Sequence, residues 1–340
     1  MGLKALAASA VQRRSMACRW AWLALAFSGL LSGQAAAGKR EEQLMAQRAS
    51  AELKASLALA PPPASQIKAL IQQERFAEFE ALSRQYEEKF KTDPRYESPL
   101  IALYSALNET DDRLREQLDK WVARRPSYIS YGARGIYKKN HGYAVRGSAA
   151  TRDTPPAQMQ RMKQLHDEAI ADLLAAIKDN ARFAPAYVAL ISINRGAGDT
   201  ASAERAVNEA VRWIPETYYV RHAYLRALHP KWGGDFSLMQ AYANSLDQAV
   251  RLNPRIWSLK AEVPAELGYE AWLSGDHAQA VRYYTEALAF GDRLEFLRNR
   301  GKAHMSARQY PAARRDFSRY LEYIEDPEID RLLKRLAGMP

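Results

Sequence analysis

From Ser65 to Pro327 the chain places small and apolar residues three and four positions apart, with polar residues between them. This is the spacing of an amphipathic α-helix, whose apolar residues share one face. Gly-Asp pairs at residues 198–199, 234–235 and 275–276 interrupt the pattern. Gly can end one helix in a left-handed turn, and Asp can cap the next by accepting hydrogen bonds from its free amides. The pattern therefore predicts a succession of helices, with a junction at each pair.

The helices that follow these junctions repeat one register. Counted from each Asp, the fourth, eighth and eleventh residues are small or apolar, and a further unit repeats the register without a Gly-Asp pair. The residues are Ala203, Val207 and Ala210; Met239, Ala243 and Leu246; Ala280, Tyr284 and Ala287; and Ala313, Phe317 and Tyr320. Since each set lies on one helix face, we expect all of them to be buried between stacked helix pairs.

This arrangement resembles the tetratricopeptide repeat, whose fingerprint is Leu-Gly, then Ala-x3-aromatic, then Pro. The best copy is Leu267-Gly268 followed by Ala280 and Tyr284, and the next copy runs from Gly301 to Phe317. The resemblance implies an all-α fold, a right-handed solenoid of helical hairpins with about six helix pairs and no strands. In such a solenoid the first helix of each pair lines the inner face of a curved body.

A second resemblance covers about residues 65–255. Its marks follow one another along the chain: a helix from Ile67 to Phe90, Arg134-Gly135, Arg146-Gly147, Asp172-Leu173-Leu174 and Pro230-Lys231-Trp232-Gly233-Gly234. Together they resemble an uncharacterised bacterial family, a domain of unknown function, and this implies a fold but no activity. We expect Trp232, Gly233 and Gly234 to be structural. Two glycines permit backbone conformations closed to other residues, and the Trp can fill the gap in a unit longer than its neighbours.

The sequence divides into five predicted segments. They are a signal peptide at 1–37, an N-terminal helix with a Pro linker at 38–64, a divergent repeat domain at 65–255, two tetratricopeptide-like repeats at 256–330 and a C-terminal tail at 331–340. Within the divergent domain, Glu97–Leu107 and Asp111–Arg124 are predicted to form a helix pair. The next pair is split by a long loop at residues 140–156. A loop of this length indicates either function or disorder, and both interpretations stay open.

The N-terminus has the pattern of a secretory signal peptide. An apolar run from Trp20 to Gly33 follows Arg19, and Ala35–Ala37 supplies small residues at the cleavage positions. We expect cleavage after Ala37 and a periplasmic or secreted protein. An uncleaved membrane anchor is the alternative, but the run is short and broken by Ser28-Gly29 and Ser32-Gly33, which favours cleavage. Met1 and Met16 both stay open as the start of the chain.

Two features of the composition restrict the possible functions. Cys18 is the only cysteine and lies in the predicted signal peptide, so the mature chain would have neither disulfides nor thiol chemistry. The formal net charge is +10, of which the first 37 residues contribute +4, and the remaining +6 is spread without a dense Lys/Arg run. We therefore expect no nucleic-acid partner. No mature apolar run is long enough for an integral membrane span after signal cleavage.

No motif for catalysis, a cofactor or a metal ion is found. The six histidines lack metal-ligand spacing, and the chain has no Gly-rich phosphate loop, no Gly-x-Ser-x-Gly elbow and no calcium loop. We therefore predict no enzyme activity, no catalytic residue, no cofactor and no metal. Around the long loop lies a basic cluster of Arg134, Lys138, Lys139, His141 and Arg146. Solvated surface charges are the interpretation we favour for it, and capture of an acidic or phosphorylated group is the alternative.

The sequence thus predicts a non-enzymatic exported repeat scaffold that holds another cell-envelope protein or peptide. Partner-binding residues are predicted on the first helices of the pairs: Tyr187, Arg195, Tyr218, His222, Arg226, Tyr269, Arg298 and Lys302. A mixture of Tyr and Arg suits an extended peptide or a partner helix.

The alternative is an envelope glycan-binding or glycan-modifying protein that uses an unrecognised carboxylate site. The five tryptophans of the mature chain would suit sugar rings, although we favour core positions for them. A groove with scattered polar groups would favour the scaffold. A pocket with convergent ionisable groups would favour the enzyme.

Overall fold

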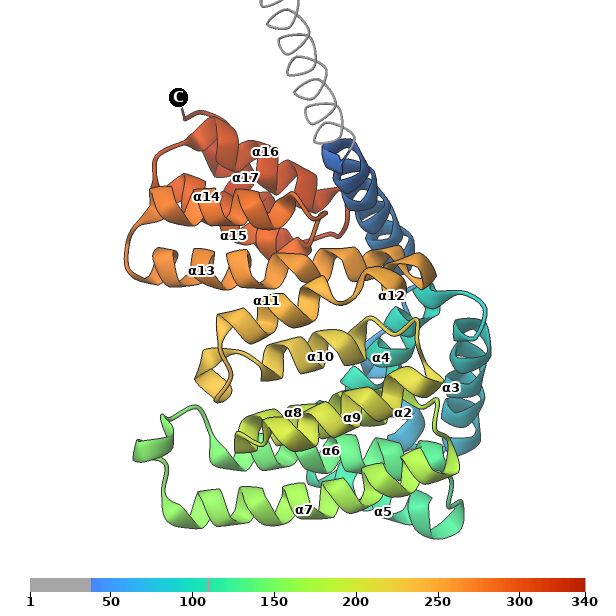
Figure 1. Cartoon of the computed structure of the whole chain (residues 1–340). Helices are drawn as coiled ribbons and strands as arrows, with labels where there is room; N and C mark the ends of the chain where they lie inside the picture. Colours follow the sequence, from blue (N-terminus) through green and yellow to red (C-terminus); the bar gives the residue numbers. More distant parts are fainter. Residues whose placement is uncertain (1–37, 109–110, 340) are drawn as a thin grey trace, which may run out of the picture. The chain divides into compact units, whose positions relative to one another are not determined.

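A computed structural model describes residues 38–108 and 111–339 (Figure 1). The chain divides into two units, Met1–Met45 and Ala46–Pro340, and every contact discussed below lies within the second unit. All elements of residues 38–108 and 111–339 are helical, without a strand among them. The predicted all-α helical-repeat fold is confirmed. The predicted signal peptide, residues 1–37, lies outside the described residues.

Short connections join the helices. After a helix at residues 38–57 come α2 (Ala64–Gln72), α3 (Phe76–Phe90), α4 (Glu97–Ser105), α5 (Asp112–Arg124), α6 (Tyr128–Arg146), α7 (Pro156–Asp179), α8 (Ala184–Ala197), α9 (Thr200–Trp213), α10 (Tyr219–Ala227), α11 (Phe236–Asn244), α12 (Asp247–Leu252), α13 (Glu262–Leu273), α14 (His277–Leu288), α15 (Leu294–Ser306), α16 (Tyr310–Leu321) and α17 (Pro327–Leu336). The 3₁₀ helices are η1 (Pro94–Tyr96), η2 (Ala106–Asn108), η3 (Thr151–Asp153), η4 (Pro230–Trp232) and η5 (Pro254–Ala261).

Consecutive helices fold back on one another as hairpins. Figure 1 shows this for α6 and α7, α8 and α9, α13 and α14, and α15 and α16. The residues of the repeated register, from Ala203 to Tyr320, are all buried, with at most 6% of any one exposed. Asp199, Asp235 and Asp276 cap their helices as predicted, each accepting a hydrogen bond from the amide three residues further on. The pattern in the sequence is therefore the pattern of the core.

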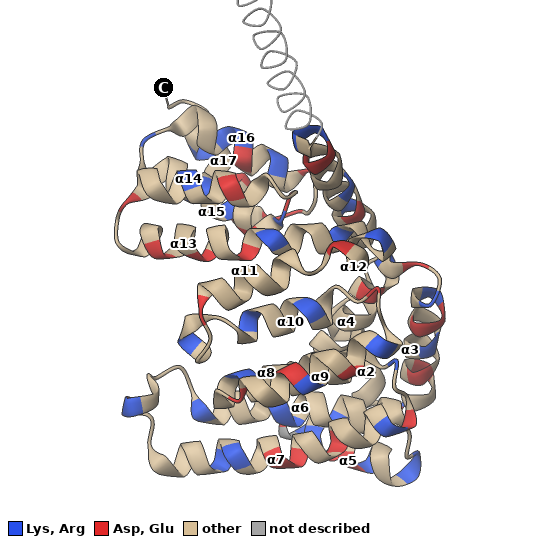
Figure 2. Ribbon diagram, viewed as in Figure 1, with Lys and Arg blue, Asp and Glu red and all other residues tan. Residues whose placement is uncertain are grey.

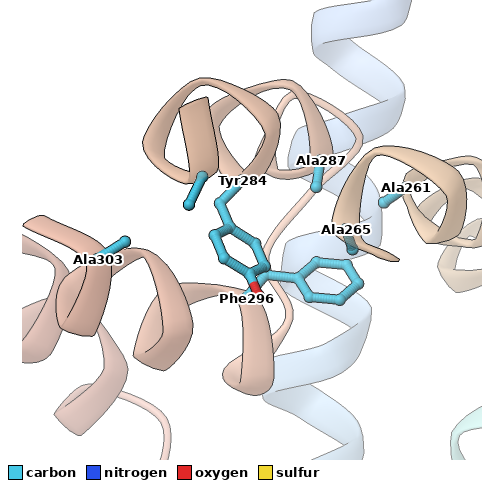
Figure 3. Packing of buried hydrophobic residues seen from close by; sticks show 7 residues of the cluster. Ala261, Ala265, Tyr284, Ala287, Phe296 and Ala303 are labelled. Carbon is cyan, nitrogen blue, oxygen red and sulfur yellow. The ribbon is translucent and has the colours of Figure 1, made fainter. Parts of the chain in front are cut away.

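Packing within the hairpins depends on small residues that face aromatic ones. One cluster comprises Ala261, Ala265, Ala280, Tyr284, Ala287, Phe296 and Ala303 (Figure 3). Gly268 of α13 lies so close to Tyr284 that a Cβ atom there would stand 3.2 Å from the ring. A Cβ atom on Gly301 of α15 would stand only 2.5 Å from the ring of Phe317. The glycines let the aromatic rings lie directly against the neighbouring backbone, which brings the two helices together.

An Arg-Gly dipeptide on α6 meets an Asp-Leu dipeptide on α7. Arg134 donates two hydrogen bonds to the carboxylate of Asp172, Nε to Oδ2 at 2.9 Å and Nη2 to Oδ1 at 2.7 Å. Beside this pair, a Cβ atom on Gly135 would lie 2.9 Å from the side chain of Leu173. A bidentate ion pair and a close glycine contact thus join α6 to α7 at the same height along the hairpin.

The same arrangement recurs between α15 and α16. Arg300 donates to Asp316 at 2.9 and 2.6 Å, and Gly301 lies against Phe317, the residue after that Asp. The divergent domain and the C-terminal repeats therefore share one hairpin geometry. They differ in length, since 38 residues separate Arg134 from Asp172 and 16 separate Arg300 from Asp316. The α6–α7 hairpin is a repeat hairpin lengthened at its closed end.

Several predicted boundaries differ from the structure. The helix expected from Ile67 to Phe90 is broken at Glu74, whose φ of 58° lies in the left-handed region, so α2 and α3 are separate. The next two helices do not form the predicted pair. Instead α4 packs mainly against α3, and α5 packs against α2 and α6.

The predicted loop at residues 140–156 is shorter than expected. α6 continues to Arg146, so the connection is residues 147–155, with η3 inside it. The helix continues because its face remains packed there: a Cβ atom on Gly142 would lie 2.5 Å from the ring of His166 in α7. α17 extends to Leu336, so the predicted tail begins inside a helix. The division into domains itself stays a prediction.

Candidate functional site

One candidate site is a groove of about 520 Å³ between α10, η4 and α13. One wall is formed by Arg226, His229, Pro230, Lys231 and Trp232. The other wall is α13, with Glu266, Tyr269, Glu270 and Leu273. We call this the α10–α13 groove.

The turn that forms one wall of the groove depends on two glycines. The His229 ring accepts a hydrogen bond from the amide of Lys231 through Nδ1 at 3.0 Å, which starts η4. Gly233 ends η4 with a φ of 92°, a conformation that side chains disfavour. A Cβ atom on Gly234 would lie 2.0 Å from the carbonyl oxygen of Leu228. These residues therefore fix the turn through backbone geometry.

Trp232 differs from its predicted role as a filler of the core. It is partly exposed and lines the α10–α13 groove. The guanidinium of Arg195 lies 5.5 Å from its ring centroid, and Nζ of Lys231 lies 5.1 Å away. Both distances are within the range of cation–π attraction. Trp232 therefore contacts two positively charged side chains at the basic wall of the groove.

The two walls carry opposite charges. Figure 2 shows Asp and Glu residues in red along α13 and Lys and Arg residues in blue on α10 and the turn after it. Arg226 reaches Glu266 at 3.8 Å, and His229 Nε2 lies 3.4 Å from the same carboxylate. Burial raises the pKa of Glu266, and the charges of Arg226 and His229 oppose that shift. Arg226 and His229 thus meet at one carboxylate, whereas Lys231 and Glu270 form no ion pair with a described residue.

Three apolar side chains of α13 stand in solvent beside the groove. Tyr269 is 46% exposed, Trp272 37% and Leu273 61%. They are three and four positions apart, so they share a helix face. The rings of Tyr269 and Trp272 stack with their centroids 6.4 Å apart. This apolar stripe is the most exposed group of large apolar residues next to the groove.

The structure brings some of the predicted partner-binding residues to this groove. Arg226 and Tyr269 line it, and Arg195 reaches it through Trp232. Tyr187 and Tyr218 are buried, at 1% and 3% exposed, so they cannot contact a partner. Tyr187 lies on a first helix, α8, as predicted, whereas Tyr218 lies just before α10 and packs against Arg255 and His222.

The remaining predicted residues lie elsewhere. His222 faces Glu262, and Arg298 and Lys302 lie on α15, where Lys302 reaches Glu328 at 3.3 Å. The sequence did not predict Lys231 and Leu273 as groove residues, nor the exposed Trp272 beside the groove. An apolar i, i+3, i+4 spacing in a helix whose opposite face was already assigned to the core is the signal that marks Trp272 and Leu273.

A second cavity, of about 270 Å³, contains the convergent ionisable groups expected of an enzyme. It is lined by Leu53, Leu57, Tyr218, Tyr219, His222, Arg255, Ser258, Asp292, Arg293, Leu294 and Glu295. Behind it, buried Glu262 is paired with both Arg293 and His222, the latter at 3.0 Å. Burial alone would raise the pKa of Glu262, but the charges of Arg293 and His222 hold it well below its usual range.

The charges around this second cavity hold helices together. Arg255 donates to Ser98 of α4 at 2.7 Å and to Tyr219 of α10 at 3.3 Å. Asp292 accepts from Arg319 at 2.8 Å and from Tyr323 at 2.6 Å. Because Arg255 and Asp292 are each bound to residues of other helices, they act as braces between segments distant in the sequence.

The remaining predicted chemistry is distributed over separate places. Asp172 binds Arg134 and also Lys138, the latter at 3.1 Å, so two of the five residues of the basic cluster predicted around the loop are neutralised. Of the tryptophans, Trp121 is fully buried and Trp213 is 50% exposed, so the predicted core role does not hold for all five. Within the described part of the chain, no group of three His, Cys, Asp or Glu side chains is arranged to hold a metal ion. No helix of that part is long and apolar enough to cross a membrane.

The helical hairpins in one register, with glycine facing an aromatic ring, define an all-α helical repeat protein, and this packing resembles that of tetratricopeptide repeats. Residues 64–200 match the family model described as Domain of unknown function (DUF4034). The second resemblance is confirmed for that segment, and the Trp232–Gly234 element lies outside it. No curated protein sequence matches the chain.

Solved structures with similarity to the chain include two tetratricopeptide repeat proteins. A thermophilic one from Thermus thermophilus is 18% identical, covers 51% of this chain and 91% of its own, and has a TM-score of 0.31. Another, from Parabacteroides merdae, is 14% identical, covers 80% of this chain and all of its own, and has a TM-score of 0.33.

Proposed function

We propose that this protein is a scaffold that holds a segment of another protein in the α10–α13 groove. The observation that supports the proposal most strongly is the apolar stripe of Tyr269, Trp272 and Leu273, exposed beside a groove with charged walls. Large apolar side chains that cluster on a surface beside polar groups are typical of protein interfaces. Arg298 and Lys302 on α15 stay proposed as further partner contacts, outside this groove.

Binding suits the groove better than catalysis. The only half-buried carboxylate in its walls, Glu266, is engaged by Arg226 and His229. A general acid or base needs a carboxyl group free to exchange a proton with a substrate. We therefore propose a non-enzymatic role. We also propose that the protein is exported and that its partner is another cell-envelope protein. The signal-peptide pattern of residues 1–37 supports export.

Site-specific photo-crosslinking in intact cells tests this proposal. A photoreactive amino acid replaces Leu273 in the groove or Trp213 on α9, which is similarly exposed and does not line the groove. We expect a defined protein adduct from the Leu273 position and none from Trp213. The mass spectra of the purified protein also report its N-terminal peptide, which we expect to begin at Gly38. Adducts from Trp213 alone would contradict the proposed site, and a full-length protein in the cytosol would contradict export.

A further inference from the structure

Positive charge gathers at one end of the α10–α13 groove, where only one of three cations, Arg226, has a counter-charge among the described residues. Arg195 forms no ion pair with any described residue, and its Nε is buried without a hydrogen-bond partner there. Lys231 contacts the ring of Trp232 but makes no ion pair in the described part of the chain. Arg226 is close to a carboxylate only at 3.8 Å, which is longer than a hydrogen bond. Two cations thus lie against the ring of Trp232, and a third, Arg226, lines the same groove.

The positive region continues onto α6. Lys139 is half-buried on a small cavity next to α8. Burial and the nearby charge of Arg195 lower its pKa to about 8. Burial also lowers the pKa of Arg195, and the charge of Arg226 lowers it further. Cations that repel one another in a partly dehydrated site favour an incoming anion.

A carboxylate fits this end of the groove chemically. A buried guanidinium N–H without an acceptor costs stability, and a charge-assisted hydrogen bond to a carboxylate satisfies it. On the opposite wall, Glu266 is paired but Glu270 is exposed and forms no ion pair with a described residue. Glu270 repels further acidic groups. The acidic residues of a ligand would therefore lie towards α8 and α10.

The other requirement on the ligand comes from the apolar stripe. The stacked rings of Tyr269 and Trp272, with Leu273 beside them, offer apolar area adjacent to the cations. Burying one large apolar side chain there would contribute roughly 1.5–3 kcal/mol. A free inorganic anion cannot use this area, whereas a peptide with acidic and apolar residues in sequence uses both parts.

We propose that the groove selects an acidic segment of the partner protein, with carboxylates against Arg195, Arg226 and Lys231 and an apolar or aromatic side chain on Tyr269, Trp272 and Leu273. This rests on the proposed function, whose groove it uses. The basic wall includes η4, which lies outside the repeat register, so the preference belongs to this chain and does not follow from the repeat fold.

Fluorescence anisotropy with labelled pools of short random peptides tests the preference on the purified protein. One pool combines Asp and Glu with Leu, Phe and Tyr, and its charge-reversed counterpart combines Lys and Arg with the same apolar residues. We expect the acidic pool to bind at least about tenfold more tightly than the basic pool, a difference of about 1.4 kcal/mol. A double variant, Arg226→Glu with Lys231→Glu, should reverse this order. An unfolded variant would bind neither pool, so reversal cannot come from loss of the fold.

The outcomes separate this inference from the proposed function. Equal binding of both pools overturns the inference, as does tighter binding of a chito-oligosaccharide than of the acidic pool. If Leu273 still crosslinks to a protein in cells, the proposed function stands while the acidic preference falls. A double variant that keeps the wild-type preference for the acidic pool also overturns the inference, because Arg226 and Lys231 would then not provide the selecting charge.

Discussion

Single residues decide where charge can be buried in this protein. Glu97 of α4 is 1% exposed, yet its carboxylate caps α10, which starts more than a hundred residues later. It accepts hydrogen bonds from the Thr217 hydroxyl, from the amide of Tyr218 at 2.7 Å and from the amide of Tyr219 at 3.2 Å. Since the free amides at a helix start attract negative charge, this contact fixes α10 to α4.

The titration of Glu97 gives a prediction about stability. Burial raises its pKa to about 7 from a usual value of 4.5, although the Thr217 hydroxyl, the two amides and Arg255 oppose the shift. Between these two pH values the folded protein holds a proton that the unfolded chain has lost. Relative to Glu97→Gln, the unfolding free energy of the wild type should therefore fall as pH rises from 4.5 to 7, by at most about 1.4 kcal/mol per pH unit.

Urea denaturation of both proteins across this pH range measures the effect. The quantity of interest is the difference between the two curves, because other carboxylates titrate alike in both proteins. Parallel curves for the wild type and Glu97→Gln would show that Glu97 does not hold the proton.

At the scale of elements, spacing in the sequence predicts pairing within a hairpin better than pairing across the chain. The register from Ala203 to Tyr320 is visible because small and aromatic residues recur every few positions, and all of these residues are buried. The pairing of α5 with α2 and α6 has no such local sign. Hydrogen bonds such as that from the Tyr218 amide to Glu97 join segments distant in the sequence, and neither segment contains a motif that indicates the contact. Tertiary packing decides these elements, so the sequence alone could not reveal them.

The turn around η4 gives a prediction at this scale. In Gly234→Val the new Cβ atom would meet the backbone of Leu228, where the nearest atom is 2.0 Å away and cannot rotate aside. We expect the melting temperature to fall by several degrees or more, since overpacking costs about 1–3 kcal/mol. Differential scanning calorimetry measures this.

Gly338→Val is the matched control, because nothing lies within 4 Å of a Cβ atom at that position. It should melt as the wild type does. If Gly234→Val melts at the same temperature as the control, the close approach of the backbone at Gly234 to Leu228 does not stabilise the turn. Any effect of Gly234→Val in cells would then come from a change in partner binding at the groove.

At the scale of the whole molecule, the sequence predicted the all-α repeat fold but only part of the candidate site. Arg195, Arg226 and Tyr269 were selected as free side chains on the first helices, and all three lie at the groove. The same rule also predicts Tyr187, which is buried, because the sequence of a helix does not show which of its faces the rest of the fold covers. The position of Trp232 beside α8 depends on the conformation of the turn. The two glycines permit this conformation, but they permit others too, so the sequence alone does not predict it.

The central claim is that a partner protein is held in the α10–α13 groove. The most direct test is the affinity of the protein captured by crosslinking, measured by isothermal titration calorimetry against three forms of this chain. These are the wild type, the groove variant Tyr269→Ala with Leu273→Ala, and Trp213→Ala as an equally exposed control. Both groove side chains are exposed, at 46% and 61%, so their removal should leave the melting temperature nearly unchanged. We predict at least about tenfold weaker binding for the groove variant and wild-type affinity for Trp213→Ala. Wild-type affinity of the groove variant would contradict the account.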